Sequence, residues 1–410
     1  MESDRPTRPL DGIRVLDFTR VLSGPHCTRM LADLGAEVIK VEPPDGDVTR
    51  FTAPRRHGMP SYYAQQNTGK RSVSFDLGRP EGRDLALRLA EQADVVVENF
   101  RPGVMERFGL DYDTVAARNP RVVYAPITGT GSTGPGRGRR AYAPVVQAET
   151  GLTKSQGDNG RGGVYRTDRH SHADVYTSLD TAAGILAALY QRERTGRGQW
   201  IDVAMAQVML YVNEHVHDDL WDGDDDPNWV RSFGNHHQPV VTVANGDAVA
   251  IAGCPTAKGT FEMYMGAIER PDLVDDPRFA SVADRWEHLD DLQQAIADYA
   301  ATVADAVALE ARFAKFTLAV GQVRSVREVC ESDWAAEREA IAHVDDRGGG
   351  TVRIPNAPWK FSDAPGVGVR GTPRYRGEDN ESVLRESLGM SDDEIAALNA
   401  SGVLSNHVPR

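Results

Sequence analysis

The first residue whose type and position could support catalysis is an aspartate in front of a strongly apolar segment. Asp174 lies in HADVYTSLD, just before LDTAAGILAALYQRER (179–194), which we predict to form a buried helix because it is apolar all round its middle. A carboxylate at a helix N-terminus stays ionised and could attack a carbonyl carbon. An aspartate that only caps the helix would occupy the same position. Position alone leaves both interpretations open.

Two segments could bind an anionic ligand. Arg137, Arg139 and Arg140 lie within four residues in a glycine-rich segment, where they could pair with phosphates, although a solvated charge run would look the same. The segment NFRPG (99–103) follows a predicted strand, and ligands of open α/β sheets bind at the carboxyl ends of strands. An ordinary strand-to-helix turn would explain that segment equally well.

Two further patterns lack the context that a cofactor or a metal needs. Gly129, Gly131 and Gly134 spell G-x-G-x-x-G, but PGRGRR follows and cannot begin the helix that a dinucleotide site requires. The pair His236-His237 and the acidic turn DGDDD (222–226) have neither zinc spacing nor a calcium-loop pattern. We therefore predict no metal site and no dinucleotide.

The elements that would position these residues alternate between strand and helix. Apolar runs and helical periodicity predict the following order: strand 13–18, helix 27–34, strand 37–42, helix 80–93, strand 94–98, helix 111–118 and strand 121–127. Such alternation predicts an α/β fold with a doubly wound, largely parallel sheet.

The composition shifts once along the chain. Helical segments run to about residue 220 and end at the acidic turn, and a hairpin candidate at 240–251 with alanine-rich helices follows. We place the N-terminal part of a large domain at 1–210, a linker at 211–237 and a smaller α+β domain at 238–330. A capped helix is expected at 391–403, because Ser391 precedes Glu394 in capping-box spacing.

Charge and apolar patterning exclude several classes of partner. The formal charge of −14, from 46 basic and 60 acidic side chains, would repel nucleic acid and anionic lipid. We expect no membrane span and no secretion signal, because no apolar run reaches about 18 residues and MESDRPTRPLDG lacks an apolar core. The three cysteines, Cys27, Cys254 and Cys330, suit a reducing cytoplasm.

Blocks along nearly the whole chain resemble, in order, family III (CaiB/BaiF) coenzyme A transferases. The resemblance is poorest between about 206 and 320. The blocks that carry it are PLDGIRVLDFTRVLSGP (9–25), LADLGAEVIKVEPPDGDVTR (31–50), NTGKRSVSFDL (67–77), ADVVVENFRPGVMERFGL (93–110), NPRVVY (119–124), GILAALYQRERTGRGQWIDVAM (184–205), APWKFSDAP and LGMSDDEIAAL.

The resemblance implies an architecture and a reaction. It implies a Rossmann-like large domain, a smaller domain, and a homodimer of two interlocked chains, with residues 331–410 as a linker that returns to the large domain. The reaction would move CoA from an acyl-CoA donor to a small carboxylic acid, through a covalent aspartyl-CoA thioester and without a tightly bound cofactor.

The resemblance also assigns site residues. The nucleophile falls on Asp174, and the CoA contacts fall on Leu22, Ser23, Phe75, Asn99, Phe100, Arg101, Arg107, Arg140 and Met205. Arg107 and Arg140 would suit phosphates.

The sequence departs from the family pattern at three places. Pro43 stands where some relatives have an arginine near the adenine, and the glycine-rich lid of oxalate-using members is missing. Leu22 replaces a polar residue of those members, which favours a larger or more apolar acyl group than formyl or oxalate.

Two alternatives remain. A 2-methylacyl-CoA racemase of the same fold would need a histidine and an aspartate as a two-base pair, but Arg140-Ala-Tyr-Ala143 stands where that histidine is expected. A binding protein that holds acyl-CoA without turnover would not need Asp174.

Overall fold

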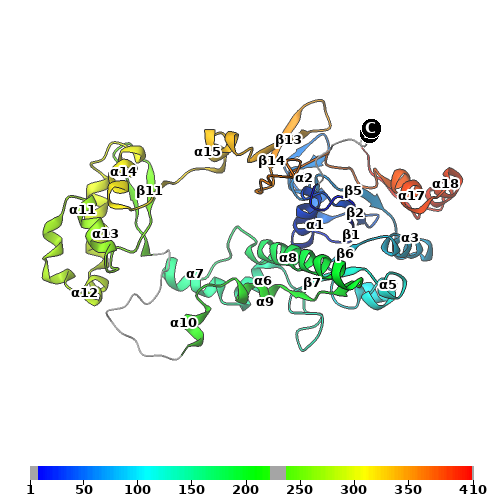
Figure 1. Ribbon diagram of the computed structural model, residues 1–410, viewed down its shortest axis with the longest axis horizontal. Coiled ribbons are helices and arrows are strands. Elements are labelled where there is room, and N and C mark those ends of the chain that lie inside the picture. The colour runs from blue at the N-terminus through cyan, green and yellow to red at the C-terminus, as the bar shows by residue number, and fades with distance from the viewer. Residues whose placement is uncertain (1–7, 222–236, 409–410) are drawn as a thin grey trace. The chain divides into compact units, whose positions relative to one another are not determined.

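The computed structural model describes residues 8–221 and 237–408, and these residues form two compact units (Figure 1). One unit draws its residues from 1–158, 164–213 and 333–410, and the other from 159–163 and 214–332. None of the helices in the described part of the chain combines the length and the apolar character that a membrane span requires.

A seven-stranded parallel sheet forms the centre of the first unit, as predicted. The strands lie in the order β5–β2–β1–β6–β7, and β8 and β9 both pair with β7. Their bounds are β1 Arg14–Asp17, β2 Glu37–Glu42, β5 Arg71–Ser74, β6 Val95–Glu98, β7 Val123–Thr128, β8 Gln199–Trp200 and β9 Val203–Ala204. In the register, Val15 lies beside both Val38 and Val95, so apolar residues of neighbouring strands share a face.

Helices cover both faces of this sheet, which explains why its strands are apolar on both sides. One core contains side chains of α1, α6, α8 and α9, and the other contains side chains of α3, α4, α5, α17 and α18. The helix bounds are α1 Ser23–Asp33, α3 Pro80–Glu91, α4 Val104–Phe108, α5 Tyr112–Arg118, α6 Ala143–Glu149, α8 His172–Thr195, α9 Met205–Tyr211, α17 Asn380–Leu388 and α18 Asp392–Ala400. The predicted capping box of Ser391 and Glu394 begins α18.

The strand order reverses between β1 and β6. From β1 the chain continues to β2 and β5 on one side, whereas β6 and β7 extend the sheet on the other side. The loops after β1 and β6 therefore open into the same crevice, where open α/β sheets bind ligands. These two loops are residues 18–22 and 99–103, and both carry predicted site residues.

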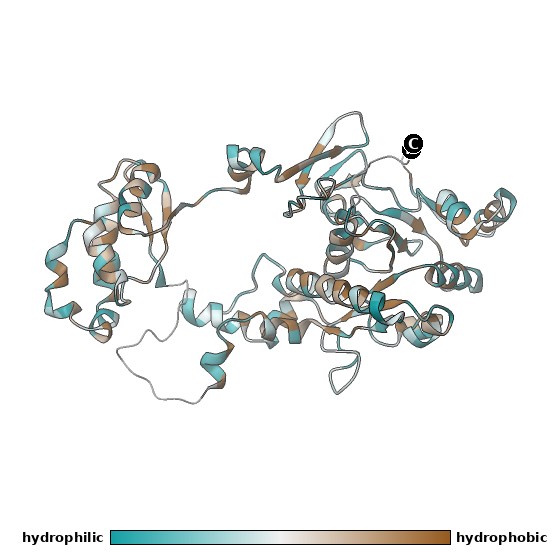
Figure 2. Cartoon of the chain, viewed as in Figure 1, coloured by the Kyte–Doolittle hydropathy of each residue, from teal (hydrophilic) through white to brown (hydrophobic). Residues whose placement is uncertain are grey.

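Two predictions about helices need correction. Helix α1 begins at Ser23 instead of residue 27, because Ser23, Gly24 and Pro25 form its first turn, where a proline costs no hydrogen bond. Helix α8 is not buried all round: Leu179, Leu186 and Tyr190 are exposed, and only one side of the helix packs on the sheet. Apolar and polar residues alternate along this helix in Figure 2.

The second unit and the remaining hairpins are smaller. Strands β10 Val240–Thr242, β11 Ala248–Ile251 and β12 Val320–Gln322 form an antiparallel sheet, which contains the predicted hairpin. Its core includes side chains of α11 Thr260–Ala267, α13 Leu289–Ala300 and α14 Ala306–Phe313. In the first unit, β13 Ile341–Asp345 and β14 Thr351–Pro355 form an antiparallel hairpin.

Candidate active site

The predicted nucleophile lies in the first turn of α8 and faces a different helix. Ser171, the N-cap residue of α8, makes no side-chain cap, so Asp174 does not belong to a capping box. Instead, the hydroxyl and the backbone N–H of Ser23, the first residue of α1, lie close enough to the Asp174 carboxylate to lower its pKa. Helix α1 packs along α8, which brings these residues together although they lie far apart in the chain.

The environment raises the pKa of Asp174 to about 6. Burial is the largest cause, and the two donors of Ser23 oppose it. This carboxylate is therefore less acidic than an exposed aspartate, because the loss of water on burial outweighs the effect of Ser23. At neutral pH most of the population is still ionised, and a carboxylate of higher pKa is the stronger nucleophile.

Asn99 connects the loop after β6 to the loop after β1. Its side-chain oxygen accepts a hydrogen bond from the backbone N–H of Arg20 (2.9 Å), and its amide donates to the carbonyl of Arg20 (2.8 Å). The same amide lies 3.3 Å from the Ser23 hydroxyl oxygen. Asn99, Ser23 and Asp174 thus form one connected group, and Leu22 is the N-cap residue of α1 beside it.

The three arginines predicted to contact CoA are all exposed, and two of them, Arg107 and Arg140, were expected to suit phosphates. Arg101 lies in the turn after β6, Arg107 in α4 and Arg140 in the loop after β7. Within the described residues no acidic side chain forms an ion pair with any of the three, so their charges are available to an anion. Arg137 pairs with Glu106 (3.3 Å), which joins the loop after β7 to α4.

The remaining predicted contacts differ in accessibility. Phe100 is half-buried against the core below its turn, and Met205 is buried at the start of α9. The Phe75 side chain is completely buried in the core on the α3 side of the sheet, whereas Asp174 and Ser23 belong to helices on the other side. The structure therefore brings most of the predicted set to one end of the sheet but leaves the Phe75 side chain no exposed surface.

Two residues near this group were not predicted. The pKa of Tyr62, in α2 (Ser61–Asn67), rises to about 12 because of burial and of the charges of Asp174 and Asp47. Burial also raises the pKa of Glu98 to about 8, although its side chain accepts a hydrogen bond from the backbone N–H of Phe100 (2.7 Å). No sequence pattern marks Tyr62, whereas Glu98 directly precedes the predicted turn.

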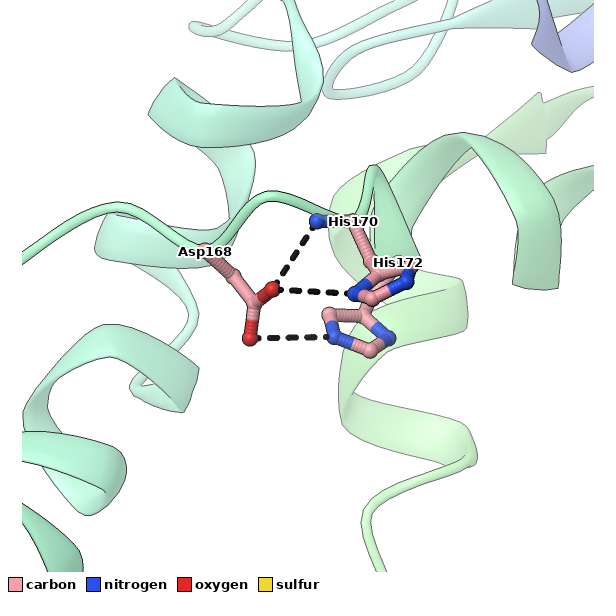
Figure 3. Close-up of side chains that lie close together, drawn as sticks. All are labelled: Asp168, His170 and His172. Atoms are coloured by element: carbon pink, nitrogen blue, oxygen red, sulfur yellow. Dashed lines mark hydrogen bonds and ion pairs between the residues drawn. The ribbon is translucent and has the colours of Figure 1, made fainter. Parts of the chain in front are cut away.

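A group of one aspartate and two histidines leads into α8 (Figure 3). Asp168 lies 3.3 Å from His170 Nδ1 and 3.4 Å from His172 Nε2, and it accepts hydrogen bonds from Gln156 and the His170 backbone N–H. These atoms are close enough to hold a metal ion, but the hydrogen bonds alone account for their arrangement. The acidic turn 222–226 and His236, where we predicted no metal site, lie outside the described residues.

Cavities lie at both ends of the sheet. A cavity of about 300 Å³ at the carboxyl ends of β6 and β7 is lined by residues that include Glu98, Pro102 and Thr128. A cavity of about 680 Å³ lies at the amino ends of β1 and β2, beside Arg14 and Glu37, and does not include Asp174. Neither Asp174 nor Ser23 lines either of these two cavities. The carboxyl end is favoured by the positions of the loops after β1 and β6 and not by the volume of a cavity.

Comparison with known proteins identifies the family of this chain. Residues 10–380 match the family model of CoA-transferase family III. The chain is 35% identical to a formyl-CoA:oxalate CoA-transferase of Streptomyces coelicolor, over 97% of this chain and 99% of that protein. It is 32% identical to a succinyl-CoA–D-citramalate CoA-transferase of Chloroflexus aurantiacus, over 98% of this chain and 100% of that protein.

Solved structures show the same fold. A CAIB/BAIF family protein from Brucella suis superposes with a TM-score of 0.78 at 30% identity, over 93% of this chain and 99% of that chain. The protein Rv3272 from Mycobacterium tuberculosis also superposes with a TM-score of 0.78, at 31% identity over 92% of this chain and 99% of that chain.

Proposed function

This chain belongs to CoA-transferase family III and is a CoA-transferase, and from that premise we propose that Asp174 carries CoA as a covalent thioester between two acids. The observation that supports this role is the environment of the Asp174 carboxylate. Burial raises its pKa, the polar groups of Ser23 in α1 lower it, and the N-cap residue of its own helix makes no side-chain cap. A carboxylate that merely capped α8 would not need this environment.

The proposed reaction exchanges acyl groups in balanced steps. The Asp174 carboxylate attacks the donor thioester carbonyl and forms a mixed anhydride, releasing CoA as a thiolate. The thiolate attacks the aspartyl carbonyl, so the donor leaves as a free carboxylate and an aspartyl-CoA thioester remains. The acceptor carboxylate attacks that thioester to form a second anhydride, and the released thiolate then attacks the acceptor carbonyl. The products are the new acyl-CoA and the free Asp174 carboxylate.

Ser23 would stabilise the charge that develops on the aspartyl oxygen. Its backbone N–H and hydroxyl lie close enough to the Asp174 carboxylate to lower its pKa, and donors fixed before the reaction stabilise a tetrahedral oxyanion best. The Asn99 amide lies 3.3 Å from the Ser23 hydroxyl oxygen and would hold this hydroxyl in place. The site must also exclude water, because hydrolysis of the thioester would waste it.

The CoA chain would bind along the exposed arginines at the carboxyl end of the sheet. Arg101, Arg107 and Arg140 carry charges without an acidic partner among the described residues, and guanidinium groups suit phosphate oxygens. Leu22 beside Ser23 favours an acyl group larger or more apolar than formyl. Neither the arginines nor Leu22 distinguishes one acyl donor or acceptor acid from another, so a panel of acyl-CoA thioesters is needed.

We also propose that the enzyme is a cytoplasmic homodimer that needs no tightly bound cofactor. The exposed apolar side of α8, with Leu179, Leu186 and Tyr190, supports a second chain as the missing cover, because soluble proteins rarely leave such a surface open. A racemase would need a histidine beside Asp174 as its second base. His172 does not fit this role, because its ring lies against Asp168 and Tyr176 and not against Asp174.

Mass spectrometry of the intact protein tests the proposal. The enzyme is incubated with a panel of acyl-CoA thioesters without any acceptor acid. We expect a CoA adduct that hydroxylamine removes and that Asp174→Ala lacks. If no thioester gives an adduct, but a 2-methylacyl-CoA exchanges its α-proton in deuterated water, the racemase alternative is correct. If the protein binds acyl-CoA with neither reaction, it is a binding protein.

A further inference from the structure

The turn that presents Ser23 to Asp174 contains a residue in an unfavourable backbone conformation. Val21 has φ of +70°, in the left-handed region that β-branched residues rarely adopt. Strained residues of this kind persist only where surrounding contacts hold them, and they cluster at functional sites. Val21 lies two residues before Ser23, so any relaxation of Val21 would move the Ser23 donors.

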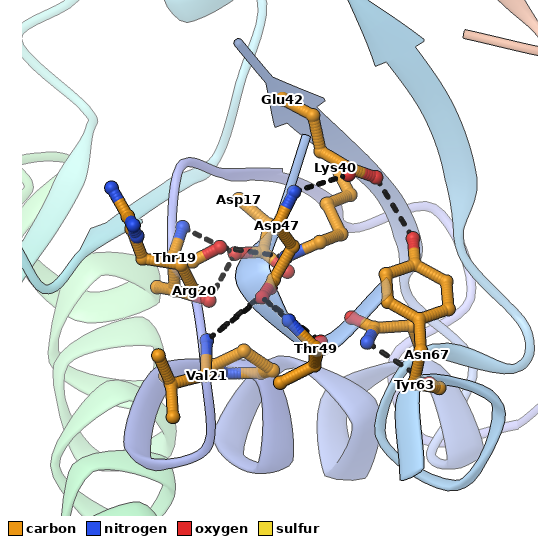
Figure 4. Close-up of polar contacts among 12 residues, drawn as sticks. Asp17, Thr19, Arg20, Val21, Lys40, Glu42, Asp47, Thr49, Tyr63 and Asn67 are labelled. Atoms are coloured by element: carbon orange, nitrogen blue, oxygen red, sulfur yellow. Dashed lines mark hydrogen bonds and ion pairs between the residues drawn. The ribbon is translucent and has the colours of Figure 1, made fainter. Parts of the chain in front are cut away.

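A buried carboxylate holds Val21 in this conformation (Figure 4). The backbone N–H of Val21 points at Asp47, at 3.2 Å and 3.4 Å from its two carboxylate oxygens. Asp47 is itself fixed, because it accepts hydrogen bonds from the backbone N–H and the hydroxyl of Thr49, both at 2.9 Å. A charged acceptor is stronger than a neutral one, especially in a buried site.

Lys40 links this carboxylate to the start of the same turn. Its ammonium group is completely buried, lies 3.3 Å from Asp47 and donates a hydrogen bond to the carbonyl oxygen of Thr19 (2.6 Å). Thr19 also donates to Asp17 from its N–H (2.8 Å). The turn is thus held on its inner side by buried charges, while Asn99 holds Arg20 from the other side.

We propose that Asp47 is a positioning residue: by accepting the Val21 N–H it maintains the strained turn that directs both donors of Ser23 at Asp174. The proposal rests on the function proposed above for Asp174. Without the Asp47 acceptor, Val21 relaxes to a negative φ, and Ser23 moves away from the carboxylate. Because an error of about 1 Å in placement can cost about 100-fold in rate, the effect on the chemistry exceeds the effect on substrate binding.

Two variants weaken or remove the contact from opposite sides. Asp47→Asn keeps the shape of the side chain and one acceptor oxygen but loses the charge that strengthens the hydrogen bond. Val21→Pro removes the N–H and fixes φ near −65°, while the ion pair of Asp47 with Lys40 stays intact. We expect both to slow formation of the Asp174 adduct by about 100-fold, with the KM for the donor thioester changed by less than about threefold. If Asp47→Asn fails to fold, the rate of Val21→Pro alone tests whether Asp47 positions Ser23.

A rescue experiment separates positioning from general stabilisation. Glycine adopts a positive φ at no cost, so Val21→Gly combined with Asp47→Asn should recover at least about tenfold of the lost rate. Asp33→Asn is the control, because Asp33 is an equally buried, ion-paired aspartate at the far end of α1. It should leave the rate of adduct formation unchanged.

A second readout needs no turnover. The donors of Ser23 lower the pKa of Asp174, so the titration of the labelled Asp174 carboxyl, followed by NMR, should move upward in Asp47→Asn and Val21→Pro. In the double variant Val21→Gly with Asp47→Asn, the titration midpoint of Asp174 should move back toward the wild-type value. Unchanged titration and unchanged adduct formation in both variants would overturn the role of Asp47. If the wild-type protein forms no adduct, the proposed chemistry of Asp174 is contradicted. The role of Asp47 is then tested only by comparing the titration of Asp174 in the variants with that in the wild type.

Discussion

At the scale of single residues, the chemistry depends on a carboxylate whose burial and hydrogen bonds act in opposite directions. Burial raises the pKa of Asp174 to about 6, and the Ser23 donors limit the rise. The result is a nucleophile that is ionised at neutral pH but more basic than an exposed aspartate. Both the rate and the stability of the protein should therefore depend on pH in a defined direction.

Adduct formation should lose rate at mildly acidic pH. Because only the ionised carboxylate attacks, we expect the single-turnover rate to be constant above about pH 7 and to fall about tenfold per pH unit well below 6. Ser23→Ala removes a donor that lowers the pKa, so its midpoint should lie higher than that of the wild type. Rapid quench with mass spectrometry measures both profiles. A wild-type midpoint near 4 would mean that burial does not control this carboxylate.

The same shift makes Asp174 costly for stability. Its pKa is higher in the folded state than in the unfolded chain, so the folded protein loses stability as the pH rises from about 4 to about 6. Asp174→Asn does not titrate and should exceed the wild type in free energy of unfolding by about 1 to 3 kcal/mol at pH 7.5. Urea unfolding at pH 7.5 and pH 4 checks this, and an equal difference at both values would contradict the prediction.

At the scale of elements, the site depends on how closely α1 approaches the turn after β1. Gly24 in the first turn of α1 leaves room for Thr19: an added Cβ would lie 2.2 Å from the Thr19 Cβ. Thr19 cannot retreat easily, because it is buried and its hydroxyl is hydrogen-bonded to Asp17. The close packing of these two elements thus fixes the start of the helix that carries Ser23.

Gly24→Ala should therefore disturb both the fold and the site. We expect a loss of about 1 to 3 kcal/mol in the free energy of unfolding, as for other overpacked positions, together with slower adduct formation. Gly184→Ala in α8 is the matched control, because its new Cβ would meet Ile201 at an ordinary 3.6 Å. It should be neutral or stabilising. Equal effects of the two substitutions in urea unfolding would show that the approach at Gly24 is not tight.

The limits of sequence-based prediction are clearest at this scale. The order of strands and helices follows from periodicity, so the positions of Asp174 at the start of a helix and of Asn99 after a strand were predictable, although α8 begins at His172 and not at residue 179. The pairing of Asp174 with Ser23 depends on the packing of α1 against α8, which no local pattern encodes. The strain at Val21 and the burial of Phe75 likewise arise from tertiary contacts, and the resemblance to a family gave no indication of either.

At the scale of the whole molecule, α8 raises the question of what covers its outer side. The sequence predicted a buried helix because the segment is apolar all round its middle, yet one chain buries only one side. A helix of this composition is expected to be covered on both sides. The apolar residues on the outer side of α8 support the homodimer that we propose.

Substituting one residue of that exposed side tests the assembly. Leu186 lies between Leu179 and Tyr190 on the exposed side of α8 and is 36% exposed. A lysine there would place a charge inside a dimer interface, and burying an unpaired charge is strongly unfavourable. We expect light scattering to give a dimer for the wild type and a monomer for Leu186→Lys. Val307→Lys, at a 74% exposed valine in α14, should remain dimeric. A wild-type monomer, or a Leu186→Lys dimer, would mean that a second chain does not cover α8.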